Sequence, residues 1–459
     1  MSQADFHFVG LGGIGMSALA RLALASKSTV SGCDTRDSSL LAQLRSEGAR
    51  VSIGHAPAHV EYAREIIVTS AIHATSEEVA RARELGIPVT TRGALLARFA
   101  DVRNGIAICG THGKTTTTAM THAALRGGAI DAGLALGGID VSLGTNAHVG
   151  TSPWFVTEAD ESDGSFALLH PQIAVLTNLE EDHVSDTNEM DNLVAAFRVF
   201  FDRLPKNGCA VVGIDNARSE RFTTHSRDCA TLTFGFSDLA DVRATEINAI
   251  ALGSRFVVHI HGERRGDVEL RVPGRINIEN ALAAIAVAHA VNVPFSDIVR
   301  GLAEFSGVRR RFDVLAHSPR AIIVDDYAHH PTAIRETIAA ARTYHDGPVV
   351  VAFQPHRYSR TAYLAREFTE ALRDADTVYL APIYAASEAP IDGINERTIG
   401  DPLIRDGHDI RYVDDVRALP EKIAREAPYG ALVLMLGAGN ITEAAAHLAT
   451  SILAHDAFA

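Results

Sequence analysis

The sequence predicts an α/β protein with three domains, each built around a mainly parallel sheet. The 459 residues correspond to about three domains of ordinary size. Short apolar runs alternate with helix-like segments along most of the chain, which is typical of parallel strands joined by crossover helices. Hydrophobic residues make up 47% of the chain and charged residues 21%, so several cores can form and a disordered protein is excluded.

The first domain is expected over residues 1–101. A strand-like run with a glycine-rich end leads into a helix-like segment, and two further pairs of this kind follow. In order, the segments read FHFVGLGGIG, MSALARLALAS, TVSGCD, LLAQLRSEGA, EIIVTSAI and SEEVARARELG. This order predicts a Rossmann-like sheet covered by helices.

The second domain is expected over residues 102–312. It opens with the strand GIAICG and a helix from Lys114, and continues with the strand-like runs PWFVTEAD, QIAVLTN and GCAVVG. Between residues 242 and 273 the apolar pattern has a period of two, as in RFVVHIHG and DVELRV, which predicts an antiparallel hairpin. An alanine-rich helix, IENALAAIAVAHAV, is expected to follow.

The third domain is expected over residues 313–459. Its strand-like runs lie in AIIVDDYAHH, PVVVAFQPH, DTVYLAP and ALVLMLGAG. Helix-like segments separate them, so this domain is again expected to be Rossmann-like.

Charge, cysteine spacing and the amino-terminal residues bear on partners and compartment. The net charge is −14, which disfavours nucleic acid as a partner. The four cysteines have no CxxC spacing and are expected to be reduced thiols of a cytoplasmic enzyme. The sequence has neither the pattern of a signal peptide nor an apolar run long enough to cross a bilayer, so no membrane insertion is expected.

The first motif is Gly10-x-Gly12-x-x-Gly15, between a strand and a helix, with Asp34 at the end of the next strand. Such glycines let the backbone approach a pyrophosphate, and the helix N-terminus supplies free N–H groups. The carboxylate of Asp34 is placed to contact a ribose. NAD, FAD and a UDP-sugar all satisfy this pattern, and a tight turn without a ligand is the alternative.

The second motif is Gly110-Thr111-His112-Gly113-Lys114-Thr115-Thr116-Thr117. It is similar to a P-loop but is not a strict Walker A sequence, because Ile108 stands where the first glycine would fall. The backbone N–H groups can still cradle an anion, Lys114 can reach the β- and γ-phosphates, and the Thr115 hydroxyl can bind Mg²⁺. The motif therefore predicts ATP.

Two acidic clusters follow strands of the second domain, at residues 158–163 and 181–183. The carboxyl ends of parallel strands meet at one edge of the sheet, so both clusters are expected to face the second motif. Carboxylate oxygens beside a triphosphate indicate Mg²⁺. A solvated acidic loop is the alternative for either cluster alone.

Basic and histidine-rich segments lie at the start of the third domain. Arg309, Arg310 and Arg311 precede it and are suited to neutralise phosphate. The segments DDYAHHP at 325–331 and QPHRYSR at 354–360 follow strands. Neither an HExxH pattern nor a nearby cysteine accompanies the paired histidines, so substrate contacts are favoured over a transition metal.

Nine segments then occur in a fixed order: GLGGIGMS, GTHGKTTT, EADESDGSF, TNLEEDH, GRINIENALAA, GVRRRFD, VDDYAHHPTAI, FQPHRYSRT and APIYAASEAPIDGI. With these segments the whole chain resembles the Mur ligases, and among them the branch that adds L-alanine to UDP-N-acetylmuramate. The resemblance implies a Rossmann-like domain for the UDP moiety, a central P-loop ATPase-like domain and a third, Rossmann-like domain for the amino acid. It also implies a monomer or homodimer that uses ATP and Mg²⁺ to ligate L-alanine to the lactyl carboxylate through an acyl-phosphate, in peptidoglycan precursor synthesis.

The resemblance assigns roles residue by residue. The UDP-sugar is expected at Gly12, Gly13, Ile14, Gly15, Asp34 and Ser70. ATP is expected at Gly110, Thr111, His112, Gly113, Lys114, Thr115, Thr116, Asn277, Asn280, Arg310 and Asp326, and Mg²⁺ at Thr115, Glu158 and His183. The amino acid is expected near Tyr327, His329, Arg357 and Arg360, and the reaction itself is expected to use Lys114, His183, Arg310 and His329. Ile276 stands where the family usually has a histidine, so the chain departs from the family pattern directly before the expected adenine contact Asn277.

Three other functions are compatible with parts of the chain. A recycling ligase would attach a tripeptide to the same UDP-sugar, but Ser162 and the segment at residues 384–390 favour alanine. An NAD-dependent oxidoreductase would leave the second motif and both acidic clusters without a role. A P-loop regulator would release ADP without requiring a UDP-sugar and an amino acid together.

Overall fold

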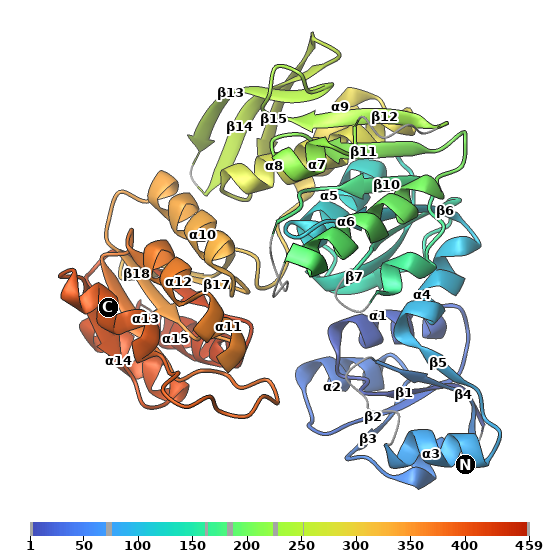
Figure 1. The fold of residues 1–459 in the computed structure, drawn as a ribbon, viewed down its shortest axis with the longest axis horizontal. Helices are drawn as coiled ribbons and strands as arrows, with labels where there is room; N and C mark the ends of the chain where they lie inside the picture. The colour runs from blue at the N-terminus through green and yellow to red at the C-terminus, as the bar shows by residue number, and fades with distance from the viewer. Residues whose placement is uncertain are drawn as a thin grey trace. The chain divides into compact units, whose positions relative to one another are not determined.

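The computed structural model describes residues 3–69, 76–160, 164–180, 187–223, 228–250 and 252–456 of the chain (Figure 1). These residues form two compact units. Unit one comprises residues 1–245, 257–268 and 279–305, and unit two comprises residues 246–256, 269–278 and 306–459. The described residues form three separate sheets, as expected for the three-domain α/β architecture.

The first sheet has five parallel strands in the order β3-β2-β1-β4-β5. In chain order they are β1 (Ala4–Val9), β2 (Val30–Asp34), β3 (Arg50–Ile53), β4 (Ala63–Val68) and β5 (Val89–Thr91). The helices between them are α1 (Ile14–Ala25), α2 (Ser39–Ser46), the 3₁₀ turn η1 (Pro57–Val60), α3 (Glu77–Glu84) and α4 (Arg92–Asp101). The strand order reverses at β1, and in such sheets ligands bind at this switch point, outside the carboxyl ends of the strands.

The second sheet has ten strands in the order β15-β14-β13-β12-β11-β10-β6-β9-β7-β8. They are β6 (Asn104–Cys109), β7 (Gly133–Asp140), β8 (Thr145–His148), β9 (Trp154–Glu158), β10 (Ile173–Leu176), β11 (Cys209–Gly213), β12 (Ala230–Gly235), β13 (Val242–Ile250), β14 (Gly253–Ile260) and β15 (Glu263–Leu270). The accompanying helices are α5 (Lys114–Gly127), η2 (Ser165–Leu168), α6 (Thr187–Asp202), α7 (Ala217–Glu220), α8 (Arg275–Ala290) and α9 (Phe295–Glu304). Strand β6, which leads into α5, pairs in parallel with β9 on one side and β10 on the other.

The period-two region contains three strands, β13, β14 and β15, rather than the two of the predicted hairpin. Only two residues separate each strand from the next, and so short a connection requires antiparallel neighbours. Strand β13 is exposed over much of its second half and reads TEINAI there. Its polar residues conceal the alternation on which the sequence-based prediction depends.

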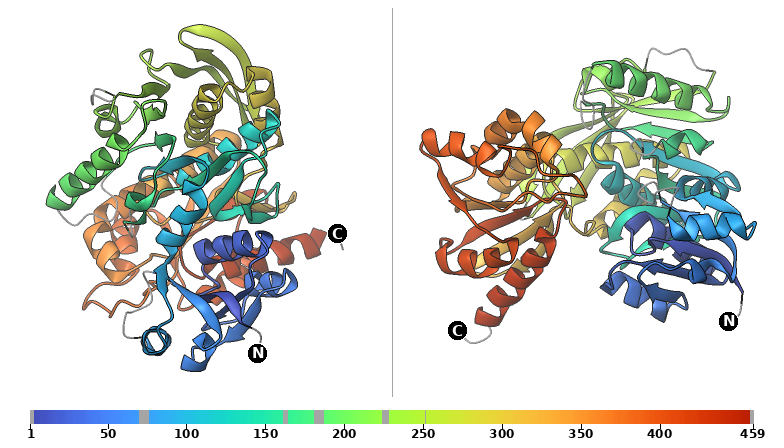
Figure 2. Two further views of the ribbon diagram at one scale, coloured as in Figure 1. Left: turned by 90° about the vertical axis from the view of Figure 1, so that its right-hand side faces the viewer. Right: turned by 60° about the horizontal axis from the view of Figure 1, so that its bottom comes forward.

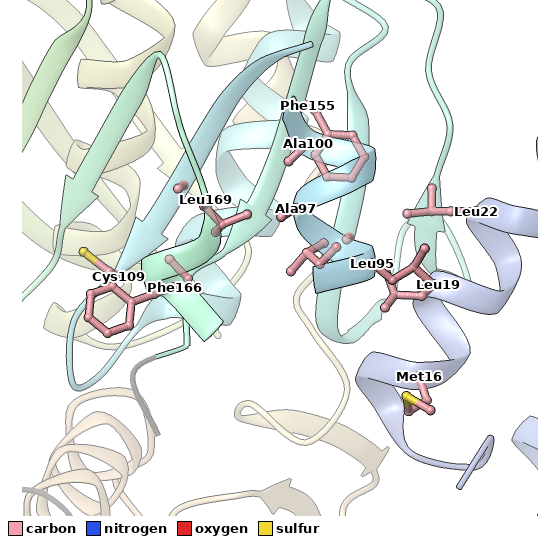
Figure 3. Packing of buried hydrophobic residues seen from close by; sticks show 14 of the residues in the cluster. Met16, Leu19, Leu22, Leu95, Ala97, Ala100, Cys109, Phe155, Phe166 and Leu169 are labelled. Atoms are coloured by element: carbon pink, nitrogen blue, oxygen red, sulfur yellow. The ribbon is translucent and has the colours of Figure 1, made fainter. Parts of the chain in front are cut away.

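A continuous apolar core joins the first sheet to the second within unit one. Side chains of α1 lie against side chains of α4, which in turn lie near Phe155 of β9 and the segment of η2 (Figure 3). Met16, Leu19 and Leu95 are at most 2% exposed. The two halves of unit one are therefore held by shared burial of apolar surface as well as by the chain itself.

The third sheet, in unit two, has six strands in the order β16-β17-β21-β18-β19-β20. They are β16 (Asp313–His317), β17 (Ala321–Asp326), β18 (Val349–Phe353), β19 (Thr377–Leu380), β20 (Asp409–Tyr412) and β21 (Ala431–Leu436), of which only β16 is antiparallel to its neighbour. The helices are α10 (Pro331–Tyr344), α11 (Tyr358–Tyr363), α12 (Ala365–Leu372), α13 (Arg397–Arg405), η3 (Val416–Ala418), α14 (Leu419–Glu426) and α15 (Ile441–Asp456). One apolar cluster lies between the sheet and α10, α12 and α13, and another lies between the opposite face and α14 and α15. Figure 2 shows helices on both faces of this sheet.

Two further expectations concern the cysteines and the membrane. All four cysteines are free thiols, and Cys33, Cys109 and Cys209 are buried. Among the residues that the structure describes, no helix is long and apolar enough to cross a bilayer.

Candidate active site

The first glycine loop (residues 10–15) connects β1 to α1 at the switch point of the first sheet. The backbone N–H groups of Gly10 and Leu11 both donate to the carbonyl of Cys33, at 2.9 Å each. Gly13 is the N-cap of α1 and has an extended backbone, and no side chain caps this helix in the described part of the chain. The first-turn N–H groups of α1, including those of Ile14 and Gly15, are thus available to an anion.

Asp34 closes this loop from the end of β2. Its Oδ2 accepts a hydrogen bond of 2.9 Å from the N–H of Gly12. A Cβ atom on residue 12 would lie 2.8 Å from the same oxygen, so the contact requires glycine at this position. The structure therefore brings Gly12, Gly13, Ile14, Gly15 and Asp34 together, whereas Ser70 lies outside the described residues.

Sequence reasoning missed the polar contact that fixes α1 against the second sheet. Asn146, in β8, is fully buried and donates to the carbonyl of Ile14 (2.8 Å) and the hydroxyl of Ser17 (2.9 Å). Arg21 donates to the Asn146 side-chain oxygen at 2.6 Å and pairs with Glu47 at 2.9 Å. These residues are far apart in the sequence and belong to no local motif, so only the tertiary structure reveals them.

The second glycine loop (residues 110–115) connects β6 to α5 in the same way. Gly110 and Gly113 have φ of +125° and +83°, and a Cβ on either would collide with neighbouring atoms. Gly113 is the N-cap of α5, which also has no capping side chain within the described chain. The loop has the open cradle of backbone N–H groups expected of an anion site.

A cation and two hard oxygen ligands lie at this cradle. Lys114 supplies the cation, and Thr115 and Glu158 supply the oxygen atoms. The Lys114 ammonium donates to the carbonyls of Gly110 (2.6 Å) and Thr111 (3.3 Å), so it lies over the loop itself. The Thr115 hydroxyl donates to Oε2 of Glu158 at 2.9 Å, and the N–H of Gly137 donates to Oε1 at 2.5 Å. The expected proximity of the first acidic cluster to the loop is therefore present for Glu158.

Residues at the end of β10 hydrogen-bond to the second glycine loop. Sequence reasoning missed this contact too. Thr177 and Asn178 are nearly buried. The Thr177 hydroxyl donates to the carbonyl of His112 at 2.7 Å, and the Asn178 side-chain oxygen accepts from the N–H of His112 at 2.8 Å. The segment TN before the second acidic cluster is the signal that could have indicated them, because polar residues at the end of a buried strand need partners.

Other residues predicted for nucleotide binding support the loop or lie on α8. The Thr111 hydroxyl exchanges hydrogen bonds with the backbone of Glu180, and Thr116 is 8% exposed in the first turn of α5. Asn280 accepts a hydrogen bond of 3.0 Å from the Thr117 hydroxyl and so ties α8 to α5. Asn277 donates to the carbonyl of Pro273 at 2.6 Å.

A second group of predicted residues lies in unit two, at the end of β17. Arg310 has a φ of +63°, which is strained for a residue with a side chain. Its guanidinium lies 4.9 Å from the centroid of the Tyr327 ring, and its Nη2 donates to the carbonyl of Gly437 at 2.8 Å. Its Nε lies 3.9 Å from Oδ2 of Asp325.

Two buried carboxyls lie beside this arginine. Burial raises the pKa of Asp325 to about 6, although the hydrogen bond from Thr442 and the charge of Arg310 act against it. Burial also raises the pKa of Asp326. Both Asp326 oxygens accept backbone N–H groups, from Phe312 at 2.8 Å and Ala328 at 2.7 Å, so in this conformation the carboxyl holds the chain around Arg310. Its expected contact with the nucleotide stays a prediction.

Two histidine rings lie between Tyr327 and the segment that leads into α11. Nδ1 of His329 donates a hydrogen bond of 2.9 Å to the carbonyl of Tyr327, and its ring lies edge-on to that of Tyr327. The His356 ring lies 5.9 Å from His329 and stacks on Tyr384 at 5.6 Å.

The arginines of the HRYSR segment flank α11. Arg357, its N-cap, has a φ of +72° and an exposed side chain 4.0 Å from Glu388. Arg360 is half-buried on the same short helix. The predicted amino-acid residues Tyr327, His329, Arg357 and Arg360 thus follow the carboxyl ends of β17 and β18, which lie on either side of β21 in the same sheet.

The residues present fit a nucleotide and Mg²⁺ on two structural observations. The N-termini of α1 and α5 have no side-chain cap in the described chain and lie beside glycine loops that side chains would fill, which suits anions. The Thr115 hydroxyl and Glu158 carboxylate form a hard oxygen pair, the donor type that Mg²⁺ prefers. His183, the third expected ligand, and Ser162, which favours alanine over a tripeptide, lie outside the described residues.

Comparison with known proteins identifies the relatives of the chain. Three family models match successive segments: "Mur ligase family, catalytic domain" at residues 5–104, "Mur ligase middle domain" at 108–288 and "Mur ligase, glutamate ligase domain" at 310–439. Two curated relatives are named UDP-N-acetylmuramate–L-alanine ligase. The one from Geotalea uraniireducens is 42% identical, with 95% of each chain covered. The one from Rhizobium meliloti is 42% identical, with 96% of this chain and 95% of that one covered.

A solved structure agrees with the relatives found by sequence. The crystal structure of UDP-N-acetylmuramate-alanine ligase MurC from Thermotoga maritima matches with a TM-score of 0.84 and 28% identity. The match covers 99% of this chain and 100% of that one. The fold and the sequence therefore point to the same relatives.

Proposed function

The chain belongs to the Mur ligase family, and from this premise we propose that it joins L-alanine to UDP-N-acetylmuramate in peptidoglycan precursor synthesis. ATP drives the reaction and is released as ADP and phosphate. The observation that carries the proposal is similarity to enzymes of this name over almost the whole chain, at 42% identity.

The chemistry follows from the poor reactivity of a carboxylate toward an amine. One oxygen of the lactyl carboxylate attacks the γ-phosphorus of ATP, the bond to the β-phosphate oxygen breaks, and an acyl-phosphate and ADP form. The uncharged amine of L-alanine then attacks the acyl carbon, and the tetrahedral intermediate expels phosphate and loses a proton. Two easier steps thereby replace one difficult step.

The residues of the chain mainly bind and screen anions. Lys114 extends over the second glycine loop, where its ammonium can leave the carbonyls of Gly110 and Thr111 for the β- and γ-phosphates. Arg310 presents a cation, already oriented by Tyr327 and Gly437, to negative charge that develops during transfer. Such preorganised charges need little rearrangement at the moment of reaction.

We assign Mg²⁺ to Thr115 and Glu158, with His183 as the further ligand. When bound, the ion neutralises phosphate charge beside the Lys114 ammonium. The first glycine loop and Asp34 hold the UDP moiety, and Arg357 and Arg360 hold the carboxylate of the amino acid. A guanidinium suits that role because it forms two parallel hydrogen bonds with a carboxylate.

The compartment and assembly belong to the same proposal. We place the enzyme in the cytoplasm, where ATP is made and free thiols such as Cys33 and Cys109 stay reduced. A monomer or homodimer is expected, without nucleic acid as a partner.

The test is ADP release measured with UDP-N-acetylmuramate against a panel of L-alanine, L-serine, glycine and a stem tripeptide. The proposal expects turnover that requires both the UDP-sugar and L-alanine. Preference for the tripeptide would indicate the recycling ligase instead. ADP release that needs neither substrate would indicate a regulator, and a change in nicotinamide absorbance would indicate an oxidoreductase.

A further inference from the structure

A compact group of potential metal ligands lies on one face of the first sheet, and none of its residues has a role assigned above. His7 of β1 and Cys33 of β2 project to the same face, because His7 pairs with Ser31 and Val9 with Cys33 in the parallel register. Glu78, in the first turn of α3, covers that face. His55 and His59 come from the segment after β3 that includes η1. We call these five residues the His7 cluster.

The atoms of this cluster are already close to one another. One ligand atom from each of His7, Cys33 and Glu78 lies within 4.8 Å of the other two. The Cys33 sulfur is 3.0 Å from Oε1 of Glu78 and 3.4 Å from Nδ1 of His55. Ligand atoms around tetrahedral zinc are roughly 3.3–3.8 Å apart, given metal–ligand bonds of about 2.0–2.3 Å. The two distances from the Cys33 sulfur are within a few tenths of an ångström of this spacing, and the widest separation in the set would have to close by at most about 1 Å.

The buried histidine supplies an independent observation. His7 is 2% exposed, and its Nδ1 shares a hydrogen bond of 2.9 Å with the Ser31 hydroxyl. Its Nε2 is buried and has no hydrogen-bond partner among the described residues. Metal-bound histidines are commonly held in this way, with one ring nitrogen on an oxygen atom and the other on the metal. If the cluster were held by hydrogen bonds alone, this buried nitrogen would have no partner, which is unfavourable.

His55 and His59 are the other two members of the His7 cluster, and they lie on the side from which a cation can enter. His55 Nδ1 lies 2.8 Å from Oε2 of Glu78, and His59 Nδ1 lies 3.3 Å from Oε1. Their side chains are 33% and 22% exposed, whereas that of Glu78 is 2% exposed. A cation can therefore reach the buried ligands from the side of the two histidines.

We propose that the His7 cluster is a binding site for a borderline divalent transition metal, of which Zn²⁺ fits best. The ligands are His7, Cys33 and Glu78, with His55 or His59 as the fourth. Sulfur, imidazole and carboxylate ligands together select Zn²⁺ over Mg²⁺ and Ca²⁺, which prefer oxygen alone. On binding, the S–H bond of Cys33 breaks, its proton goes to solvent, and a bond from the sulfur to the metal replaces it.

The bound metal would join β1, β2, η1 and α3 directly beneath the first glycine loop. The carbonyl of Cys33 accepts the N–H groups of Gly10 and Leu11, so its side chain and backbone would tie the metal to that loop. The site is structural in this proposal, because none of its side chains belongs to the reacting groups.

The test uses the full-length protein, freed of metal by chelation and then titrated with Zn²⁺ and with Co²⁺. One Zn²⁺ is expected to bind per chain in the presence of excess Mg²⁺. Co²⁺ is expected to give the near-ultraviolet charge-transfer band of a cobalt–thiolate bond. Cys33→Ser should remove this band, whereas Cys109→Ser and Cys209→Ser, two other buried thiols, should retain it.

A second variant covers the possibility that Cys33→Ser does not fold. The double variant His55→Ala/His59→Ala removes two partly exposed side chains and should keep the circular dichroism spectrum of the wild type. Its affinity for Zn²⁺ should fall by about tenfold or more. Zn²⁺ should also raise the melting temperature of the wild type more than that of this variant. No thiolate band in the wild type, a band that survives Cys33→Ser, or unchanged Zn²⁺ affinity in the double variant would overturn the site.

Discussion

The two glycine loops of unit one have the same architecture and different chemistry. Each follows a strand inside a parallel arrangement, ends at an uncapped helix and begins with a glycine at positive φ. The first loop has an acidic partner, since Asp34 accepts the N–H of Gly12. The second has a basic residue of its own, Lys114, and a hydroxyl–carboxylate pair formed by Thr115 and Glu158.

This difference teaches that glycine spacing predicts an anion site without specifying which anion. The backbone cradle is common to both loops, whereas the side chains around it select the ligand. A carboxylate suits the hydroxyls of a ribose next to a diphosphate, and a lysine with hard oxygen atoms suits a triphosphate with Mg²⁺. The account therefore assigns the UDP-sugar to the first loop and ATP to the second.

The largest effect is expected for Lys114→Ala. Loss of the ammonium over the second loop should lower kcat by about a thousandfold or more, because the charge on the transferred phosphate is no longer compensated. ADP release under saturating substrates measures it. Lys206→Ala, which removes an exposed lysine paired with Asp228, is the control and should keep normal turnover. Near-normal activity of Lys114→Ala would break the assignment of the second loop.

Arg360→Ala should affect the binding of L-alanine and not the ligands of the two glycine loops. It therefore serves as a third, independent substitution beside those in the loops. Loss of a charged hydrogen bond of ~1.5–3 kcal/mol should raise the KM for L-alanine by about ten- to a hundredfold. The KM values for ATP and UDP-N-acetylmuramate should change much less. Arg366→Ala, an exposed arginine in the next helix, is the matched control. An equal rise in all three KM values would place the amino-acid carboxylate elsewhere.

Glu158→Gln tests the oxygen pair of the second loop. The amide keeps the shape of the side chain but is a weaker ligand for a hard cation, so the Mg²⁺ concentration for half-maximal turnover should rise by about tenfold. Turnover should recover partly at high Mg²⁺. The exposed Glu220 supplies the control variant, Glu220→Gln. An unchanged Mg²⁺ titration would remove Glu158 from the ligand set.

The smallest effect is expected for Asp34→Asn. The neutral side chain can still accept the N–H of Gly12, but the hydrogen bonds lose their charge assistance. A loss of about 1 kcal/mol corresponds to a rise of roughly fivefold in the KM for UDP-N-acetylmuramate. Asp37→Asn, which changes an exposed carboxylate paired with Arg45, should leave that KM unchanged. A rise in the KM for ATP instead would contradict the assignment of the first loop.

Local patterns predicted most of the fold. Strands such as β6 and β18 are continuous apolar runs that end in glycine or polar residues, which is sufficient to identify them and the helices that follow. The pattern was insufficient for β13, because its outer half is polar and exposed. β13 lies inside the sheet between β12 and β14, and backbone pairing with these neighbours does not require apolar side chains at its exposed positions.

The same distinction separates the site residues that could be predicted from those that could not. Lys114 and Asp34 stand in contiguous motifs whose chemistry is local. Asn146 and the His7 cluster depend on residues that only folding brings together, such as Arg21 with Asn146 and Cys33 with Glu78. The sequence favoured substrate contacts over a metal for His329 and His330, and it gave no local sign of the cysteine-containing cluster in the first sheet.

The central claim, that each glycine loop binds its own ligand, is tested most directly by equilibrium calorimetry with one ligand at a time. Lys114→Ala and Asp34→Ala are each titrated with UDP-N-acetylmuramate alone and with Mg²⁺-ATP alone, so that no turnover occurs. The account predicts that Lys114→Ala weakens ATP binding and leaves UDP-N-acetylmuramate within about twofold of the wild type. Asp34→Ala should do the reverse, by about tenfold for a charged hydrogen bond. Equal weakening of both ligands by either variant would contradict the claim.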